Sequence, residues 1–237
     1  MRLAIMQPYF FPYIGYFSLI RNTDQFILLD TIQFIRHGWI ERNRILNQQE
    51  GWIYFKVPII KENGRSTLIN EIRIDNNQNW KQKIIAQMQS YKKIAPYYNK
   101  VMEMLNELFS HEFNDMVSLN KASLEKVFNY LRLDIHVQVF SEMNLNIEQP
   151  KEPDEWALNI CKAIGGVNEY WNPPGGQTFF DRQKYLKAGI DIKFMTQIIA
   201  PYSQHRPTFE PRLSIIDIMM FNDIDVIYKM MENYELS

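Results

Sequence analysis

Two residues near the N-terminus carry side chains that can accept a proton from a substrate. Asp30 ends the predicted strand at residues 24–29, and His37 follows it in a polar segment. A carboxylate or an imidazole in such a position is typical of a general base. We therefore predict that Asp30 or His37 is catalytic. The alternatives are that Asp30 caps a turn and that His37 is an exposed loop side chain.

Basic and amide side chains lie close to these two residues in the sequence. Arg42, Asn43 and Arg44 are consecutive, and Gln33 comes before them. Guanidinium groups offer forked donors that match a phosphate. Because residues i and i+2 face apart on a helix, the two arginines reach one anion together only from a loop or a strand. We predict that the arginines bind phosphate and that Gln33 and Asn43 are polar contacts; the alternative is that the arginines are solvated.

An aromatic loop precedes this segment. Residues 7–17 read QPYFFPYIGYF, in which two prolines four positions apart are incompatible with a helix or a central strand. The rings supply more flat surface than a turn needs. We predict that this loop binds a ligand. Gln7 would make a polar contact, the helix that starts at Gly15 would offer its backbone N–H groups, and tyrosines would stack on a base or a sugar. These tyrosines are Tyr9, Tyr13 and Tyr16.

The order of the elements favours a sheet that positions these residues at one edge. The apolar pattern predicts strands at residues 3–6, 24–29, 52–57, 68–74, 135–140, 169–171 and 192–195. We expect the third and fourth of these strands to form a hairpin that turns at residues 61–65. Strands separated by helices indicate a mainly parallel sheet, and ligands bind such sheets beyond the carboxyl ends of the strands.

Helical periodicity dominates the middle and the end of the chain. We predict three helices between residues 76 and 132, the third with Asn114 as its N-cap, and further helices after Asp154, at 181–187 and from 213 onward. The sequence therefore predicts one α/β domain with a mainly parallel Rossmann-like sheet, a helical block and a helical C-terminus. Its parts are the N-terminal strand–loop–helix–strand unit with the hairpin (1–75), the helical insert (76–132), and the C-terminal strands and helices that complete the site (133–237).

Several motifs resemble one protein family. The stretches QPYFFPYIGYF, LLDTIQF and WIERNRI, together with a late segment that contains LSIID, resemble the WbqC-like family of bacterial surface-polysaccharide gene clusters. The resemblance covers nearly the whole chain, and it implies a protein encoded beside enzymes that make nucleotide-linked sugars for O-antigen or capsule.

The late motif residues are also candidates for the site. Polar motif residues at both ends of a chain commonly meet in one place. We therefore predict that four late residues contact the substrate: Tyr202, Gln204, Ser214 and Asp217. A role for Asp217 in bracing the closing helix is the alternative.

A second comparison concerns residues 13–16. Nucleotidyltransferases carry a His-x-Gly-His signature between a strand and a helix, and this chain has Tyr13-Ile14-Gly15-Tyr16 in that context. The glycine and the helix start are kept. Two phenols, however, replace the cationic histidines that help to stabilise a transferring phosphoryl group. Nucleotidyl transfer is therefore a less favoured function.

Composition bounds the other classes of function. The chain has 237 residues, of which 46% are hydrophobic, and its formal net charge is −1. This composition suits a substantial core and disfavours broad nucleic-acid binding, although a local basic patch at residues 36–44 stays compatible with it. The lone Cys161 excludes an intramolecular disulfide, and its apolar neighbours favour a packed thiol over a nucleophile.

Metal binding and membrane insertion are not expected. Acids and histidines do not recur at the spacing of metal ligands, so we predict no metal site. No stretch approaches ~20 apolar residues, and the N-terminus lacks the pattern of a signal peptide. We therefore expect a cytoplasmic protein.

These expectations combine into a predicted function. Without a protein nucleophile, group transfer requires direct attack by the substrate on an activated donor. We predict transfer of an acyl or aminoacyl group, for example glycyl, to the amine of a nucleotide-linked amino sugar. The donor is unknown, with an acyl carrier protein or a charged tRNA as candidate partners, and no tightly bound cofactor is expected. The alternative is a non-catalytic protein that holds a nucleotide sugar for neighbouring enzymes.

Overall fold

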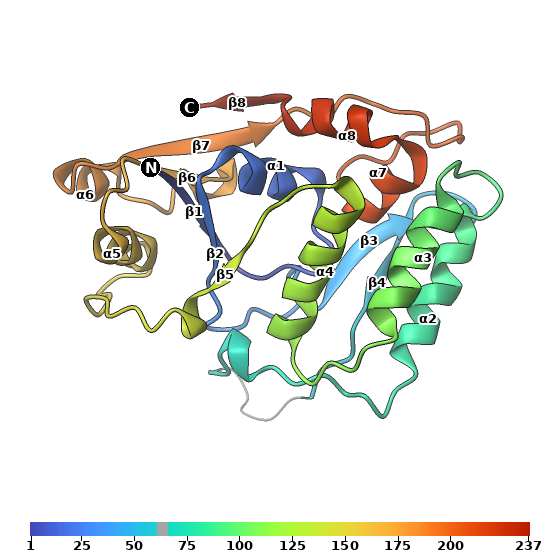
Figure 1. The fold of residues 1–237 in the computed structure, drawn as a ribbon, viewed down its shortest axis with the longest axis horizontal. Coiled ribbons are helices and arrows are strands. Elements are labelled where there is room, and N and C mark those ends of the chain that lie inside the picture. The colour runs from blue at the N-terminus through green and yellow to red at the C-terminus, as the bar shows by residue number, and fades with distance from the viewer. Residues whose placement is uncertain (61–65) are drawn as a thin grey trace.

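The computed structural model describes residues 1–60 and 66–237, so the predicted turn at residues 61–65 lies outside the described part of the chain. Its centre is a six-stranded sheet with the order β5-β2-β1-β6-β7-β8 (Figure 1). The first five strands in this order pair in parallel, and β8 is antiparallel to β7. The strands are β1 (Arg2–Met6), β2 (Gln25–Leu28), β5 (Gln138–Val139), β6 (Glu169–Asn172), β7 (Asp191–Gln197) and β8 (Tyr234–Leu236). The predicted α/β class with a mainly parallel sheet is confirmed.

Helices cover both faces of this sheet. Alternate residues of a strand point to opposite faces, and the inner strands carry apolar side chains on both, so each face is buried under helices. They are α1 (Ile14–Asn22), α2 (Trp80–Gln87), α3 (Tyr98–Phe109), α4 (Met116–Leu131), α5 (Glu155–Ile164), α6 (Arg182–Lys187), α7 (Ile215–Phe221) and α8 (Ile224–Met231). Leu3 and Ile5 of β1 pack into an apolar cluster with α5 and α6, whereas Ala4 belongs to a larger cluster with α1, α4, α7 and α8. Figure 1 shows α5 and α6 at one end of the molecule and α2 and α3 at the other, with α4 between them.

The three predicted helices of the insert are present as α2, α3 and α4. The third begins differently from the prediction: its N-cap is Asp115, whose carboxylate accepts from the backbone N–H of Ser118 at 2.8 Å. The carbonyl of Asn114 instead accepts from the backbone of Ile74 at 2.9 Å. An aspartate cap satisfies one of the free N–H groups of the first helical turn. No helix within the described residues is long and apolar enough to cross a membrane.

The hairpin also differs from the predicted one. β4 (Trp52–Lys56) pairs antiparallel with β3 (Arg42–Leu46), which precedes it in the chain. The predicted pairing of residues 68–74 with β4 is replaced by two other contacts. The start of this segment bonds to the chain after β2, where the N–H of Asn70 donates to the carbonyl of Asp30 at 2.9 Å. Its end returns antiparallel onto the residues after β4, as the predicted hairpin has it, with an isolated bridge between Ile59 and Ile74. The hairpin therefore puts the two predicted phosphate-binding arginines on one strand.

The strand order reverses its direction between β1 and β6. From β1 the chain runs to β2 on one side, whereas from β6 it runs to β7 on the other. Open α/β sheets have a crevice at such a point, beyond the carboxyl ends of the two strands. These ends are Met6 and Asn172, so the aromatic loop after β1 starts at the crevice.

Candidate functional site

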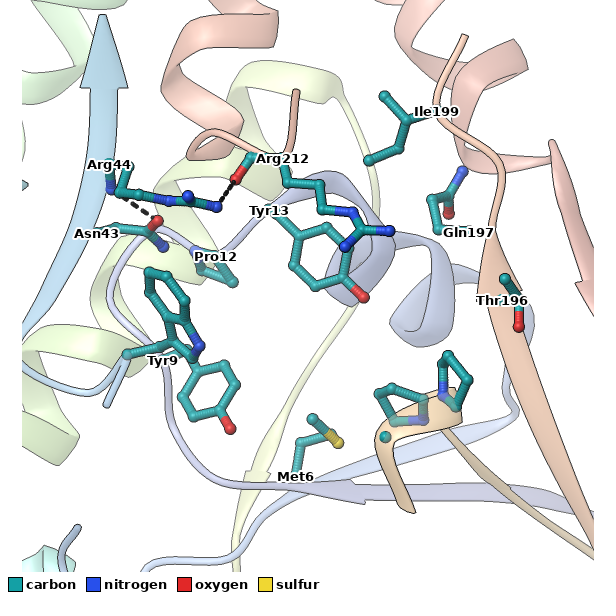
Figure 2. A pocket seen from close by; sticks show the side chains of 14 residues that line it. Met6, Tyr9, Pro12, Tyr13, Asn43, Arg44, Thr196, Gln197, Ile199 and Arg212 are labelled. Carbon is teal, nitrogen blue, oxygen red and sulfur yellow. Dashed lines mark hydrogen bonds between the residues drawn. The ribbon is translucent and has the colours of Figure 1, made fainter. Parts of the chain in front are cut away.

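A cavity of about 340 Å³ lies beyond the carboxyl ends of β1, β6 and β7 (Figure 2). We call it the arginine cavity, because Arg44 and Arg212 line it and no carboxylate is among the described side chains around it. Two guanidinium groups without an acidic neighbour favour an anionic ligand. Its neutral lining residues include Met6, Tyr9, Tyr13, Asn43 and Gln197.

A second cavity of about 780 Å³ adjoins the first, and we call it the broad cavity. The linings of the two cavities share Met6, Tyr9 and Gly175. The broad cavity is lined by amide and aromatic side chains that include Gln7, Gln33, Asn172, Trp156, Phe179 and Phe180. A ligand with two chemically different parts can therefore span both cavities.

Hydrogen bonds from distant elements hold the aromatic loop in place. Asn43 of β3 donates through Nδ2 to the carbonyls of Phe10 and Phe11 at 3.1 and 2.9 Å. Ser214, the N-cap of α7, donates through Oγ to the same Phe11 carbonyl at 2.7 Å. Asn120 of α4 donates to another carbonyl of the loop at 2.8 Å. These contacts fix the tyrosines of the loop relative to the sheet.

Of the three tyrosines predicted to stack on the ligand, two line the arginine cavity. Figure 2 shows Tyr9 and Tyr13 with their rings beside its interior. Tyr16 is buried instead, and its hydroxyl donates to the carbonyl of Gln7 at 2.8 Å. Gly15 explains the position of Tyr13, because a Cβ on residue 15 would lie 2.4 Å from the Tyr13 ring. Only glycine leaves room for this ring over the start of α1.

The two cavity tyrosines are hydrogen-bond donors at neutral pH. Burial raises the pKa of Tyr9 and of Tyr13 above its usual value. For Tyr13 the positive charge of Arg212 acts in the opposite direction and lowers the pKa. Because a phenol with a raised pKa keeps its proton, both hydroxyls can donate to an anion but do not act as bases.

The two arginines reach the cavity from opposite ends of the chain. The guanidinium of Arg44 lies between the rings of Trp39 and Trp52, at 5.3 and 4.9 Å from their centroids. It also donates to the carbonyl of Arg212 at 3.0 Å, while its Nε is buried without a partner among the described residues. Figure 2 shows the side chain of Arg212 beside the ring of Tyr13.

The cationic pair of the cavity is thus Arg44 with Arg212 and not Arg44 with Arg42. Arg42 lines neither cavity. Its guanidinium lies 4.1 Å from the ring centroid of Tyr54 and donates to two carbonyls of the preceding loop. Arg212 is not among the residues predicted from the sequence, and the signal that points to it is its place directly before the late LSIID motif.

The two predicted bases lie outside both cavities. Asp30 is buried, and its carboxylate accepts from the backbone N–H of Ser141 at 3.1 Å and from the Ser141 hydroxyl. This carboxylate therefore joins the end of β2 to the segment after β5. His37 is exposed, and its backbone N–H donates to Glu41 at 3.1 Å. A catalytic role for either residue stays a prediction.

The late motif residues form a buried network. Asp217 of α7 accepts from the Tyr91 hydroxyl at 2.7 Å, from Gln204 Nε2 at 2.9 Å and from the Tyr202 hydroxyl. Burial raises the pKa of Asp217 to about 6, although its three hydrogen-bond donors act to lower it. Neither cavity is lined by Tyr202, Gln204, Ser214 or Asp217. The contacts of Asp217 agree with the bracing role that was the alternative to substrate contact.

Cys161 lies away from both cavities. It is buried in α5, where burial raises the pKa of its thiol to about 12. The predicted packed thiol is confirmed. Within residues 1–60 and 66–237, no group of three or more His, Cys, Asp or Glu side chains is placed so that it could hold a metal ion.

The chain is similar to proteins of one family. A model of the WbqC-like protein family matches residues 7–228, a range that includes the aromatic loop, both cavity arginines and the buried network. The uncharacterized protein Rv1507c of Mycobacterium tuberculosis (strain ATCC 25618 / H37Rv) is 26% identical over 220 residues, which cover 92% of this chain and 92% of that protein. No solved structure matches the chain significantly.

Proposed function

The chain belongs to the WbqC-like protein family, and we propose that it binds a nucleotide-linked sugar of surface-polysaccharide (O-antigen) synthesis in the arginine cavity. The observation that carries the proposal is the pair of guanidinium groups, Arg44 and Arg212, in a cavity that no described carboxylate lines. A diphosphate has the complementary charge and accepts forked hydrogen bonds from arginine.

The surroundings of the arginines suit the other parts of such a ligand. The protonated hydroxyls of Tyr9 and Tyr13 can donate to phosphate oxygens, and their rings can pack against a sugar or a base. Gln197 also lines the cavity, and its Nε2 is held by the carbonyl of Met230 at 2.7 Å, so its side chain is fixed beside the ligand.

Isothermal titration calorimetry with UDP-linked and dTDP-linked amino sugars tests this proposal. We expect the parent protein to bind at least one of them. Arg212→Ala should weaken that binding by roughly tenfold or more, because a hydrogen bond to a charged group contributes about 1.5–3 kcal/mol. Arg182→Ala, which removes an exposed arginine outside the cavity, is the matched control and should bind like the parent. No binding by the parent, or equal binding by Arg212→Ala, would contradict the proposal.

Acyl or aminoacyl transfer to the amine of the bound sugar is a second candidate function. It is favoured by the shared wall of the two cavities at Met6, Tyr9 and Gly175, where an acceptor in one cavity would meet a donor in the other. The amine nitrogen forms a bond to the carbonyl carbon of an ester or thioester, and the carbon–oxygen or carbon–sulfur bond breaks. The amine gives its proton to a base, and the leaving oxygen or sulfur takes up a proton.

Substitution of the candidate bases tests the transfer. Glu152 is the carboxylate among the described side chains that line the broad cavity. If it accepts the proton, Glu152→Gln should lower turnover by about 10²–10⁴ while sugar binding is retained. If the predicted bases act instead, this loss should follow Asp30→Asn or His37→Gln. The absence of turnover in the parent with any activated donor would favour the non-catalytic binding function.

A further inference from the structure

A row of three rings and two guanidinium groups lies along one face of the β3–β4 hairpin and the loop before it. The guanidinium of Arg42 lies 4.1 Å from the ring centroid of Tyr54, whose ring lies 5.0 Å from that of Trp52. The guanidinium of Arg44 lies 4.9 Å from the Trp52 ring, and Trp39 completes the row at 5.3 Å from Arg44. We call these five residues the stacking row.

The stacking row is accessible and lies in a basic segment. Trp39 and Trp52 have 36% and 39% of their surface exposed. The register of the hairpin places the exposed Lys56 opposite Arg42, at one end of the row. Residues 36–56 contain four Lys and Arg residues against two Glu residues, so this segment is positive although the chain as a whole is not.

The row leads into the arginine cavity. Trp39 and Arg44 belong both to the row and to the cavity lining. Beside the turn of the hairpin, Arg206 adds a further cation, since its guanidinium donates to the carbonyl of Gln49 at 3.4 Å. A strand-like ligand that lies along the row would therefore have its end at the cavity.

We infer that the stacking row binds the unpaired end of an RNA that carries the transferred group, an inference that rests on the transfer proposed above. Exposed rings interleaved with guanidinium groups are a surface on which unpaired bases stack, while nearby cations contact the phosphates. An acidic carrier protein and an RNA both carry the negative charge that complements these cations. An RNA also has flat bases that can stack on the exposed tryptophan rings, and for this reason the row favours RNA.

In this reaction the group is joined to the terminal ribose of the RNA as an ester. The amine nitrogen of the sugar forms a bond to the ester carbonyl carbon, and the bond between that carbon and the ribose oxygen breaks. The amine loses a proton, and the ribose oxygen leaves as a hydroxyl that has gained one. Atoms and charge balance without an oxidant or a reductant.

Fluorescence anisotropy with a short labelled unpaired RNA tests the inference without any sugar ligand. We expect the parent to bind this RNA with an affinity that falls as salt rises, and to bind the same RNA more weakly once it is annealed to its complement. Trp52→Ala should weaken binding by about fivefold or more, because it removes a stacking surface, and Trp52→Phe should restore most of the loss. Lys56→Glu should weaken binding, whereas the same charge reversal at the exposed Lys83 of α2 should not.

The outcomes separate this inference from the proposed sugar binding. Lys56→Glu should keep the nucleotide-sugar affinity of the parent in calorimetry, because Lys56 lines neither cavity. The inference is overturned if the parent does not bind the unpaired RNA at low salt, if the duplex binds as tightly, or if an acidic carrier protein binds and the RNA does not. If the row binds RNA but the protein binds no nucleotide sugar, the proposed function is contradicted while RNA binding by the stacking row is supported.

Discussion

The arginine cavity and the network around Asp217 contain residues from the same late segment of the chain, yet they differ in exposure and in charge. In the cavity, Arg44 and Arg212 line open volume without a described carboxylate beside them. In the network, Asp217 is buried and accepts hydrogen bonds from the hydroxyls of Tyr91 and Tyr202. Polar motif residues therefore divide between those placed to contact a ligand and those that hold the contact residues in position.

One short segment joins the two regions. Ser214, which caps the helix that carries Asp217, donates through Oγ to the carbonyl of Phe11 at 2.7 Å. Its backbone N–H donates to the carbonyl of Arg44 at 2.9 Å. The start of α7 thus supports both the aromatic loop and β3. Changes in the network should act first on the fold, whereas changes in the cavity should act on the ligand alone.

Removal of the shared acceptor should have the largest effect. Asp217→Ala leaves the hydroxyls of Tyr91 and Tyr202 without their acceptor and removes one of the two acceptors of the Gln204 amide, and a buried unsatisfied polar group costs about 1–3 kcal/mol. We expect the free energy of unfolding to fall by roughly 3–5 kcal/mol, as measured by urea unfolding. Arg212→Ala should change it by about 0.5 kcal/mol or less. Equal destabilisation by the two variants would contradict the proposal that the network supports the fold and the cavity residues do not.

The pH dependence of stability separates the two regions in a second way. The pKa of Asp217 is raised to about 6 in the folded protein, from an ordinary value of 3.8. The folded state therefore holds this proton more tightly, so its contribution to stability is complete below about pH 4 and is lost as the pH rises through 6. The shift corresponds to roughly 2–3 kcal/mol. Urea unfolding between these pH values should show this loss in the parent and not in Asp217→Asn; parallel curves for the two proteins would disprove it.

A smaller effect is expected in the cavity at the start of α1. In Gly15→Ala the new methyl group would lie 2.4 Å from the Tyr13 ring, so the ring must move away. Alanine favours a helix over glycine by about 0.5–1 kcal/mol, and stability should therefore stay close to that of the parent. Nucleotide-sugar affinity in calorimetry should fall by about 2- to 10-fold, as expected for one lost hydrogen bond. If Gly15→Ala and Tyr13→Phe both bind like the parent, Tyr13 does not contact the ligand.

The sheet could be predicted from the sequence because its inner strands are apolar on both faces. Leu3, Ala4 and Ile5 all lie in the core, as the continuous apolar run indicates. The partner of β4 could not be predicted in the same way, since the β3 sequence RNRIL has a polar start and pairing depends on contacts elsewhere. The edge strand β8 is short and mostly exposed, so it carries no periodic pattern that a sequence analysis would detect.

The site was predictable where the signal is local. The prolines and rings of residues 7–17 identify the aromatic loop, and two of its tyrosines line the cavity. Residue type alone does not separate a carboxylate that contacts a ligand from one that braces the fold. The carboxylate of Asp30 accepts a hydrogen bond from Ser141, and that of Asp217 accepts one from Tyr91. Both donors lie far away in the sequence. The sequence places Arg212 directly before the LSIID motif, but its contact with Arg44 exists only in the folded chain.

A crystal structure of the protein with a bound UDP-linked amino sugar would show whether the diphosphate lies in the arginine cavity. We expect the diphosphate beyond the carboxyl ends of β1 and β6, within hydrogen-bond distance of the guanidinium groups of Arg44 and Arg212. The hydroxyls of Tyr9 and Tyr13 should lie beside it, and the network around Asp217 should be unchanged. A diphosphate bound away from both arginines, or a sugar that contacts Asp217 through an opened network, would contradict the account.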